Sequence, residues 1–119
     1  MAMYECVYFS TAFGESPAQE FINSLDSKTQ RKFFYKKELL EEFGPRLPYP
    51  HAKYIGSGIY ELRFEGIEGT VRVIYFFYSG NIIVFTNGFI KKSNKIPNQE
   101  LRLARQRMKL FRGVRGDRR

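Results

Sequence analysis

Cysteine, histidine and long apolar runs are scarce in this sequence, and each scarcity excludes a class of protein. The single cysteine, Cys6, excludes a disulfide within the chain. With His51 as the single histidine, Cys/His zinc sites are excluded as well, and no paired-acid spacing indicates a Mg²⁺ site. The first ten residues lack the charged start and apolar core of a signal peptide, and no apolar run is long enough to span a membrane. We therefore expect a cytoplasmic protein that uses neither a metal nor a cofactor.

The composition is that of one folded domain with an excess of positive charge. The 119 residues suffice to bury a core, and 43% hydrophobic and 17% aromatic residues favour a globular fold over disorder. Twenty Lys and Arg residues against twelve Asp and Glu residues give a formal net charge of +8. This balance favours an anionic partner, which can be nucleic acid, a membrane surface or an acidic protein, although many small domains are simply basic.

The first part of the sequence predicts a strand followed by a helical hairpin. Residues 3–10 are rich in aromatic and β-branched side chains, which predicts a strand. Ser16 followed by Pro17 is typical of a helix start. A second helix is predicted to begin at residue 26 or 27 and to end at residue 43, where Gly44 is placed to cap it.

The second part predicts a loop, three strands and a final helix. Residues 46–58 contain prolines and glycines without periodicity, so we expect a loop. Strands are predicted near residues 59–65, 70–78 and 81–89, and a helix is predicted from Pro97 to about Phe111. The order β-α-α-β-β-β-α predicts an α+β fold: an antiparallel meander with the first strand at one edge and the helices packed on one face. We expect a single domain, residues 1–112, followed by a basic, disordered tail, residues 113–119.

Two arginines are predicted to face each other across a hairpin. If the short loop at residues 66–69 closes a regular hairpin, Phe64 faces Val71 and Arg63 faces Arg72. Directly opposed like charges destabilise a sheet, and a fold tolerates them most easily where an anion neutralises them. The pair therefore favours a phosphate site. The alternative interpretation pairs Arg63 with Glu61 or Glu65 of its own strand in surface salt bridges.

Further polar and basic residues are predicted to share this sheet face. A two-residue turn at Ser79 and Gly80 places Asn87 opposite Arg72, and the period of two then brings Phe89 and Lys91 to the same face. Such a face can hold a phosphodiester and stack neighbouring bases. Candidate stacking residues also include Tyr49, Tyr54 and Tyr60, although the alternation of Tyr60 with apolar residues favours the core for its side chain.

Two other groups of basic residues have a functional and a neutral interpretation. His51 is a natural general acid or base, or else an exposed loop residue, and Lys53 either binds RNA or is solvated. The final helix carries a stripe of cations beside its apolar face, which is either a docking surface or a solvated helix face. This helix stripe consists of Arg102, Arg105, Lys109 and Arg112.

Three segments carry a resemblance to a known family. Residues 58–64, 71–75 and 88–93, together with Pro97, Glu100 and Ala104, resemble the RelE/HigB superfamily of bacterial toxins, and most closely its phage-derived HigB-like branch. The resemblance implies a RelE-like fold and a small basic toxin encoded beside an inhibiting antitoxin. It also implies metal-independent cleavage of messenger RNA in the ribosomal A site. In that reaction a ribose 2′-hydroxyl attacks the adjacent phosphate and leaves a 2′,3′-cyclic phosphate.

The resemblance also implies roles for individual residues. Arg72 matches the arginine that stabilises charge on the phosphoryl oxygens, Arg63 matches a basic position on the preceding strand, and Lys91 or Lys92 matches one after the last strand. We expect further RNA contacts from Lys53, Asn87, Lys95, Arg102, Arg105 and Lys109.

The sequence departs from the family pattern at two places. Glu61 stands where RelE itself has a lysine, and no Tyr or His follows Lys92 where some members keep a catalytic one. The general acid or base is therefore unassigned; His51, Lys53 or a lysine of residues 91–95 are the candidates. A weakly active or inactive member stays an open alternative.

The leading hypothesis is a ribosome-dependent mRNA endoribonuclease toxin, whose partners are mRNA, the ribosome and a small helix-turn-helix antitoxin. One alternative is a ParE-like toxin that inhibits DNA gyrase, although ParE-like chains usually lack basic residues such as Arg63 and Arg72 on these strands. The other alternative is a non-catalytic RNA-binding module. The sequence leaves open the codon preference, the antitoxin's identity, the oligomeric state and the host.

Overall fold

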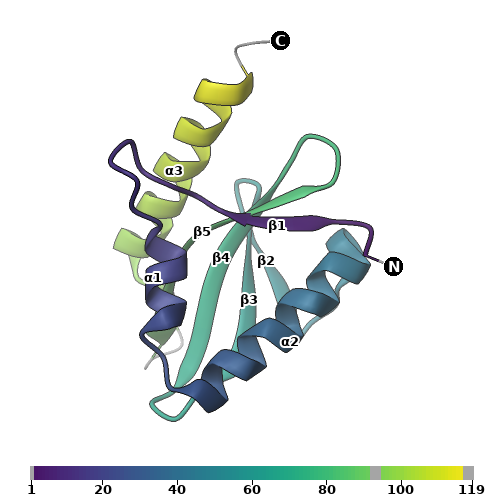
Figure 1. The fold of residues 1–119 in the computed structure, drawn as a ribbon, viewed down its shortest axis with the longest axis vertical. Helices are drawn as coiled ribbons and strands as arrows, with labels where there is room; N and C mark the ends of the chain where they lie inside the picture. The colour runs from purple at the N-terminus through teal and green to yellow at the C-terminus, as the bar shows by residue number, and fades with distance from the viewer. Residues whose placement is uncertain (1, 92–94, 117–119) are drawn as a thin grey trace.

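The protein folds as a five-stranded sheet with helices on both faces (Figure 1). The computed structural model describes residues 2–91 and 95–116, with the side chains of residues 2–91 and 95–113. In chain order the elements are β1 (Glu5–Tyr8), α1 (Pro17–Asn23), α2 (Ser27–Phe43), the 3₁₀ turn η1 (Gly44–Arg46), β2 (Ala52–Gly56), β3 (Ile59–Glu65), β4 (Thr70–Tyr78), β5 (Ile82–Lys91) and α3 (Asn98–Gly116). The strand order is β1-β5-β4-β3-β2, with β1 parallel to β5 and the other pairs antiparallel. The predicted α+β class, the central meander and the edge position of the first strand are confirmed.

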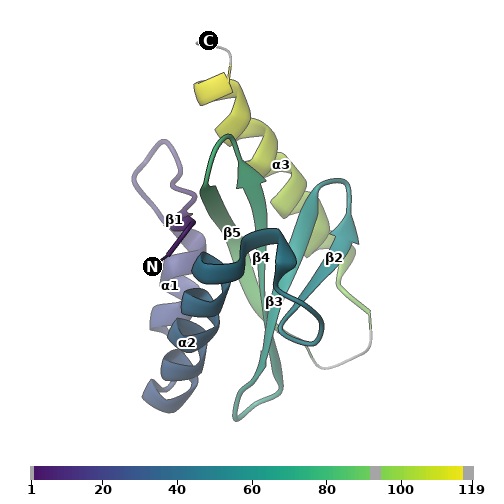
Figure 2. The same cartoon turned by 90° about the vertical axis from the view of Figure 1, so that its right-hand side faces the viewer.

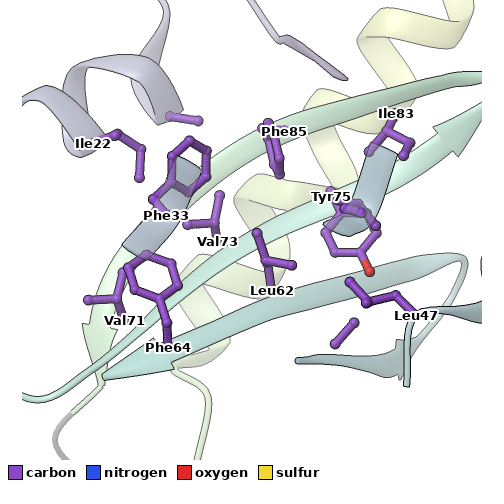
Figure 3. Packing of buried hydrophobic residues seen from close by; sticks show 13 residues of the cluster. Ile22, Phe33, Leu47, Leu62, Phe64, Val71, Val73, Tyr75, Ile83 and Phe85 are labelled. Atoms are coloured by element: carbon purple, nitrogen blue, oxygen red, sulfur yellow. The ribbon is translucent and has the colours of Figure 1, made fainter. Parts of the chain in front are cut away.

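The sheet is apolar on both faces, so the helices divide between them (Figure 2). On one face α1 and α2 pack against the sheet, and Phe33 of α2 lies in a core with Leu62 and Phe85 of the strands (Figure 3). On the other face Ala104 and Phe111 of α3 join a second core with Ile59, Ile74, Phe76, Val84 and Phe89. The expectation that all helices pack on one face was wrong, because the alternate residues of β3, β4 and β5 are apolar as well and need their own cover.

The signals that bound α2 act as the sequence predicts, whereas Ser16 makes no side-chain capping hydrogen bond at the start of α1. The carboxylate of Asp26 accepts hydrogen bonds from the backbone N–H and the hydroxyl of Thr29, at 3.0 and 2.6 Å, and so caps α2. These bonds lower the pKa of Asp26. At the other end Gly44 has a φ of 55° and packs against the ring of Tyr4, where a Cβ atom would clash.

The segment before the meander forms a strand that the sequence analysis missed. Residues 46–58 were expected to be a loop, but β2 pairs with β3 so that Ala52 faces Leu62 and Lys53 faces Glu61. A register shift between Tyr54 and Gly56 then ends the pairing. The strand is short and lies between prolines and glycines. Its pairing with β3, rather than an alternation of apolar residues in its own sequence, determines its conformation.

The predicted register is confirmed between β3 and β4 and is wrong between β4 and β5. Arg63 faces Arg72 and Phe64 faces Val71, as predicted. Arg72 faces Phe89, however, while Asn87 faces Ile74. The turn after β4 is longer than two residues, because Tyr78 pairs with Ile82. A β-bulge between Ile74 and Tyr75 then adds a further shift. Each shift displaces the pairing by one residue, so together they displace it by two. Because side chains alternate between the faces of a strand, Asn87 and Phe89 still lie on the predicted face of the sheet.

The final helix is longer than expected. α3 continues past Phe111 to Gly116, which includes part of the segment expected to be a disordered tail. The rest of that tail, residues 117–119, lies outside the described residues, as does Lys92. Among the described residues, none of the helices combines the length and apolarity that crossing a membrane requires.

Candidate functional site

A buried carboxylate lies between the two opposed arginines. Glu61 is fully buried, and its Oε2 atom accepts a hydrogen bond from Nη1 of Arg72. The Nε atom of Arg63 lies 3.3 Å from the same oxygen. The chain thus supplies its own anion for the pair. The alternative interpretation, an ion pair between Arg63 and Glu61, is confirmed, but with the carboxylate buried rather than at the surface.

Two lysines add to the positive charge around this carboxylate. Lys53 faces Glu61 across β2 and β3, and Lys91 faces Thr70 at the end of β5, on the face of Arg72. Desolvation and repulsion from Arg72, with smaller contributions from Arg63 and Lys53, lower the pKa of Lys91, and Glu61 opposes this shift. We call Lys53, Glu61, Arg63, Arg72 and Lys91 the basic cluster: four cations around one carboxylate.

Arg72 and Arg63 differ in how they can meet a ligand. Arg72 is only 7% exposed, and its Nε atom and the Oε1 atom of Glu61 are buried without a hydrogen-bond partner among the described residues. A buried polar atom without a hydrogen bond lowers the stability of the fold. The pair of Arg72 and Glu61 is therefore held in place by its ion pair, but its hydrogen-bonding capacity is not fully used. The side chain of Arg63 is 21% exposed, and its guanidinium lies 5.0 Å from the ring centre of the exposed Tyr49. Arg63 is therefore the accessible arginine, and Arg72 is the fixed one.

The one histidine is held by a lysine of α2. Nζ of Lys36 lies 2.6 Å from Nδ1 of His51. A charged ammonium can only donate, so Nδ1 accepts and the neutral ring carries its proton on Nε2. Desolvation lowers the pKa of Lys36. This arrangement presents His51 as a hydrogen-bond donor, and it lends no support to the predicted role in acid–base catalysis.

The contact between Lys36 and His51 predicts lower stability in mild acid. Desolvation and then repulsion from Lys36 lower the pKa of His51 from its usual 6.5. The unfolded chain therefore binds the proton more readily, so this stability is present above about pH 6.5 and is lost as pH falls through the folded-state pKa. Thermal melts between neutral pH and about pH 5 should show a steeper decline for the wild type than for His51→Gln. Equal declines in the two proteins would contradict this assignment.

The remaining predicted RNA contacts fall into two groups. Asn87 is buried and donates to the carboxylate and backbone oxygens of Glu100, at 2.9 and 3.3 Å, so it tethers α3 and is not available at the surface as predicted. The cations of the helix stripe are exposed, as are Lys53 and Lys95, so their role in binding RNA stays a prediction. Tyr60 stacks on Tyr75 at 5.5 Å in the core, which confirms the structural interpretation of that residue.

Sequence reasoning missed the residues of α2 that lie near the cluster. Lys36 and Tyr35 come close to Arg63 only through the packing of α2 on the sheet. The sequence signal for them is weak, because a helix segment that mixes lysines and aromatics, such as residues 32–37, is also typical of a solvated face. Within residues 2–91 and 95–113, no three His, Cys, Asp or Glu side chains gather as a metal site requires.

A comparison with protein families identifies the family of this chain. Residues 20–109 match the sequence model of the family described as "Phage derived protein Gp49-like (DUF891)". The chain belongs to this family. The Gp49-like proteins are a toxin family of toxin–antitoxin systems, related to RelE and HigB. The matched range includes α2, the whole basic cluster and most of α3. A search of curated proteins finds no match to the chain.

Proposed function

We propose that this Gp49-like protein is a toxin of the HigB-like branch that cleaves messenger RNA on the ribosome without a metal. The observation that carries the proposal is the basic cluster: more cations than anions around Arg72, which Glu61 fixes in place. A charged group that is held before the substrate arrives needs no reorganisation when charge develops in the transition state.

The proposed reaction needs positioning and charge stabilisation. The 2′-oxygen forms a bond to phosphorus and loses its proton, while the bond to the 5′-oxygen breaks and that oxygen gains a proton. Arg72 and Arg63 stabilise the phosphoryl oxygens, with Lys91 and Lys92 as the further cations. Lys91 is also the best-supported acid or base, because desolvation and then repulsion from Arg72 lower its pKa.

Primer extension on messages from cells that produce the protein tests this proposal. We expect new 5′ ends within reading frames, and we expect them to disappear when the start codon of the same message is removed. Cleavage of the untranslated message would contradict ribosome dependence. Absence of new ends, with loss of gyrase supercoiling activity, would favour the ParE-like alternative. The other alternative, a non-catalytic RNA-binding module, would give neither result.

We further propose that a cognate antitoxin inhibits this protein. Its surface offers acidic partners two exposed sets of cations, around Arg63 and along the helix stripe. Co-expression with the product of the neighbouring gene is expected to restore growth and to yield a complex on size-exclusion chromatography. Separate migration of the two proteins, with growth inhibition unrelieved, would contradict the pairing.

A further inference from the structure

A groove between α2 and β3 opens directly beside the basic cluster. It has a volume of about 470 Å³ and is lined by Lys32, Tyr35, Lys36, Arg63 and Glu65, among others. Arg63 belongs both to this groove and to the basic cluster, because it lies near the end of β3, next to the point where β2 begins. The groove lies on the α2 face of the sheet and the basic cluster lies on the α3 face, so Arg63 is the residue at which the groove meets the proposed site of the scissile phosphate.

The groove combines cations with the exposed ring of Tyr35, and a second exposed ring, that of Tyr49, contacts Arg63 outside the groove lining. Nζ of Lys32 donates to the backbone oxygen of Glu65 at 3.0 Å, which brings its charge to the rim of the groove, and Lys36 carries a second charge beside His51. The carboxylate of Glu65 accepts from the hydroxyl of Thr70 at 2.8 and 3.0 Å. Tyr35 is 58% exposed and Tyr49, against Arg63, is 65% exposed.

We propose that this groove binds the single-stranded RNA next to the scissile phosphate. Tyr35 and Tyr49 stack on bases, while Lys32, Lys36 and Arg63 contact the phosphates. Large exposed rings among cations are the means by which proteins hold single strands without reading their sequence, because every base offers a flat π face. The cations of the groove outnumber Glu65, its one carboxylate among the residues named, so its charge complements a polyanion. This inference rests on the proposed function, in that the cluster supplies the adjoining phosphate site.

Fluorescence anisotropy with a short, labelled 2′-O-methyl oligonucleotide tests the groove apart from catalysis. This RNA lacks the attacking hydroxyl, so binding is measured whether or not the protein is a nuclease. Tyr35→Ala is expected to weaken binding about tenfold. Lys32→Ala should lower the slope of log affinity against log salt by about 0.7, the value for one phosphate contact to a single strand.

Neighbouring residues of α2 provide matched controls. Phe34 is 45% exposed and Arg31 is exposed, and neither lines the groove, so Phe34→Ala and Arg31→Ala should leave the affinity within about twofold. Photo-crosslinking with 4-thiouridine RNA is expected to label the peptides that contain Tyr35 or Tyr49. Equal losses in the groove variants and the controls, or crosslinks confined to α3, would overturn the proposal. So would RNA binding that is unaffected in Tyr35→Ala while binding of a partner protein is lost, since the groove would then be a protein-binding surface.

Discussion

Replacing Arg72 with alanine in a Glu61→Gln background is expected to abolish growth inhibition while leaving a folded protein. The single change Arg72→Ala would leave the buried Glu61 carboxylate without its main partner, so lost activity could reflect lost stability. Glutamine keeps the shape of Glu61 and removes its charge, which separates the two effects. Loss of one preorganised donor typically costs about 3 kcal/mol in the transition state, a hundredfold or more in rate.

The matched control is Glu61→Gln alone, which keeps Arg72 and should still inhibit growth. Circular dichroism spectra of both proteins verify that they are folded. Arg63→Ala should reduce growth inhibition less, because Arg63 is the more exposed and less fixed of the two arginines. A double variant as toxic as its Glu61→Gln parent would show that Arg72 has no role at the phosphate.

Glu61→Ala is expected to lower the free energy of unfolding by about 3–5 kcal/mol, the usual loss when one partner of a buried ion pair is removed. Glu61 is fully buried and is the anion that lies between Arg63 and Arg72. Without it, opposed like charges remain on neighbouring strands. For a domain of this size the change corresponds to a fall in melting temperature of roughly 15 °C.

Urea denaturation of Glu61→Ala beside Glu65→Ala measures this effect. Glu65 lies on the same strand but is exposed, so its loss should change stability by no more than about 0.5 kcal/mol. A cost below about 1 kcal/mol for Glu61→Ala would mean that the carboxylate is solvated and does not organise the cluster.

The parts of the fold that follow from short-range signals could be predicted from the sequence. The loop at residues 66–69 closes the hairpin that sets Arg63 opposite Arg72. Asp26 caps the start of α2 with its side chain, and Gly44 ends the helix with its backbone conformation. The β-bulge at Ile74 could not be predicted, because a bulge leaves little trace in residue periodicity. The strand β2 was missed for a related reason: its pairing with β3 outweighs its own weak pattern.

The site was predicted in part. Alternation along β3 puts Glu61 on the face of Arg63, so their pairing was among the predicted alternatives. Its burial depends on neighbouring strands and on a second core, which local sequence does not reveal. The contact between Lys36 and His51 and the groove beside Arg63 arise from the packing of α2 on the sheet, which brings together residues that are distant in sequence.

The most direct measurement of the central claim uses a translated message with one changed sugar. In a reconstituted translation reaction, the cleaved bond is mapped first, and the nucleotide on its 5′ side is then replaced by its 2′-deoxy counterpart. If the basic cluster supports attack by the 2′-hydroxyl, the wild-type protein cuts the ribose message and spares that bond in the deoxy message. Cleavage of the deoxy message at the same bond would contradict this mechanism.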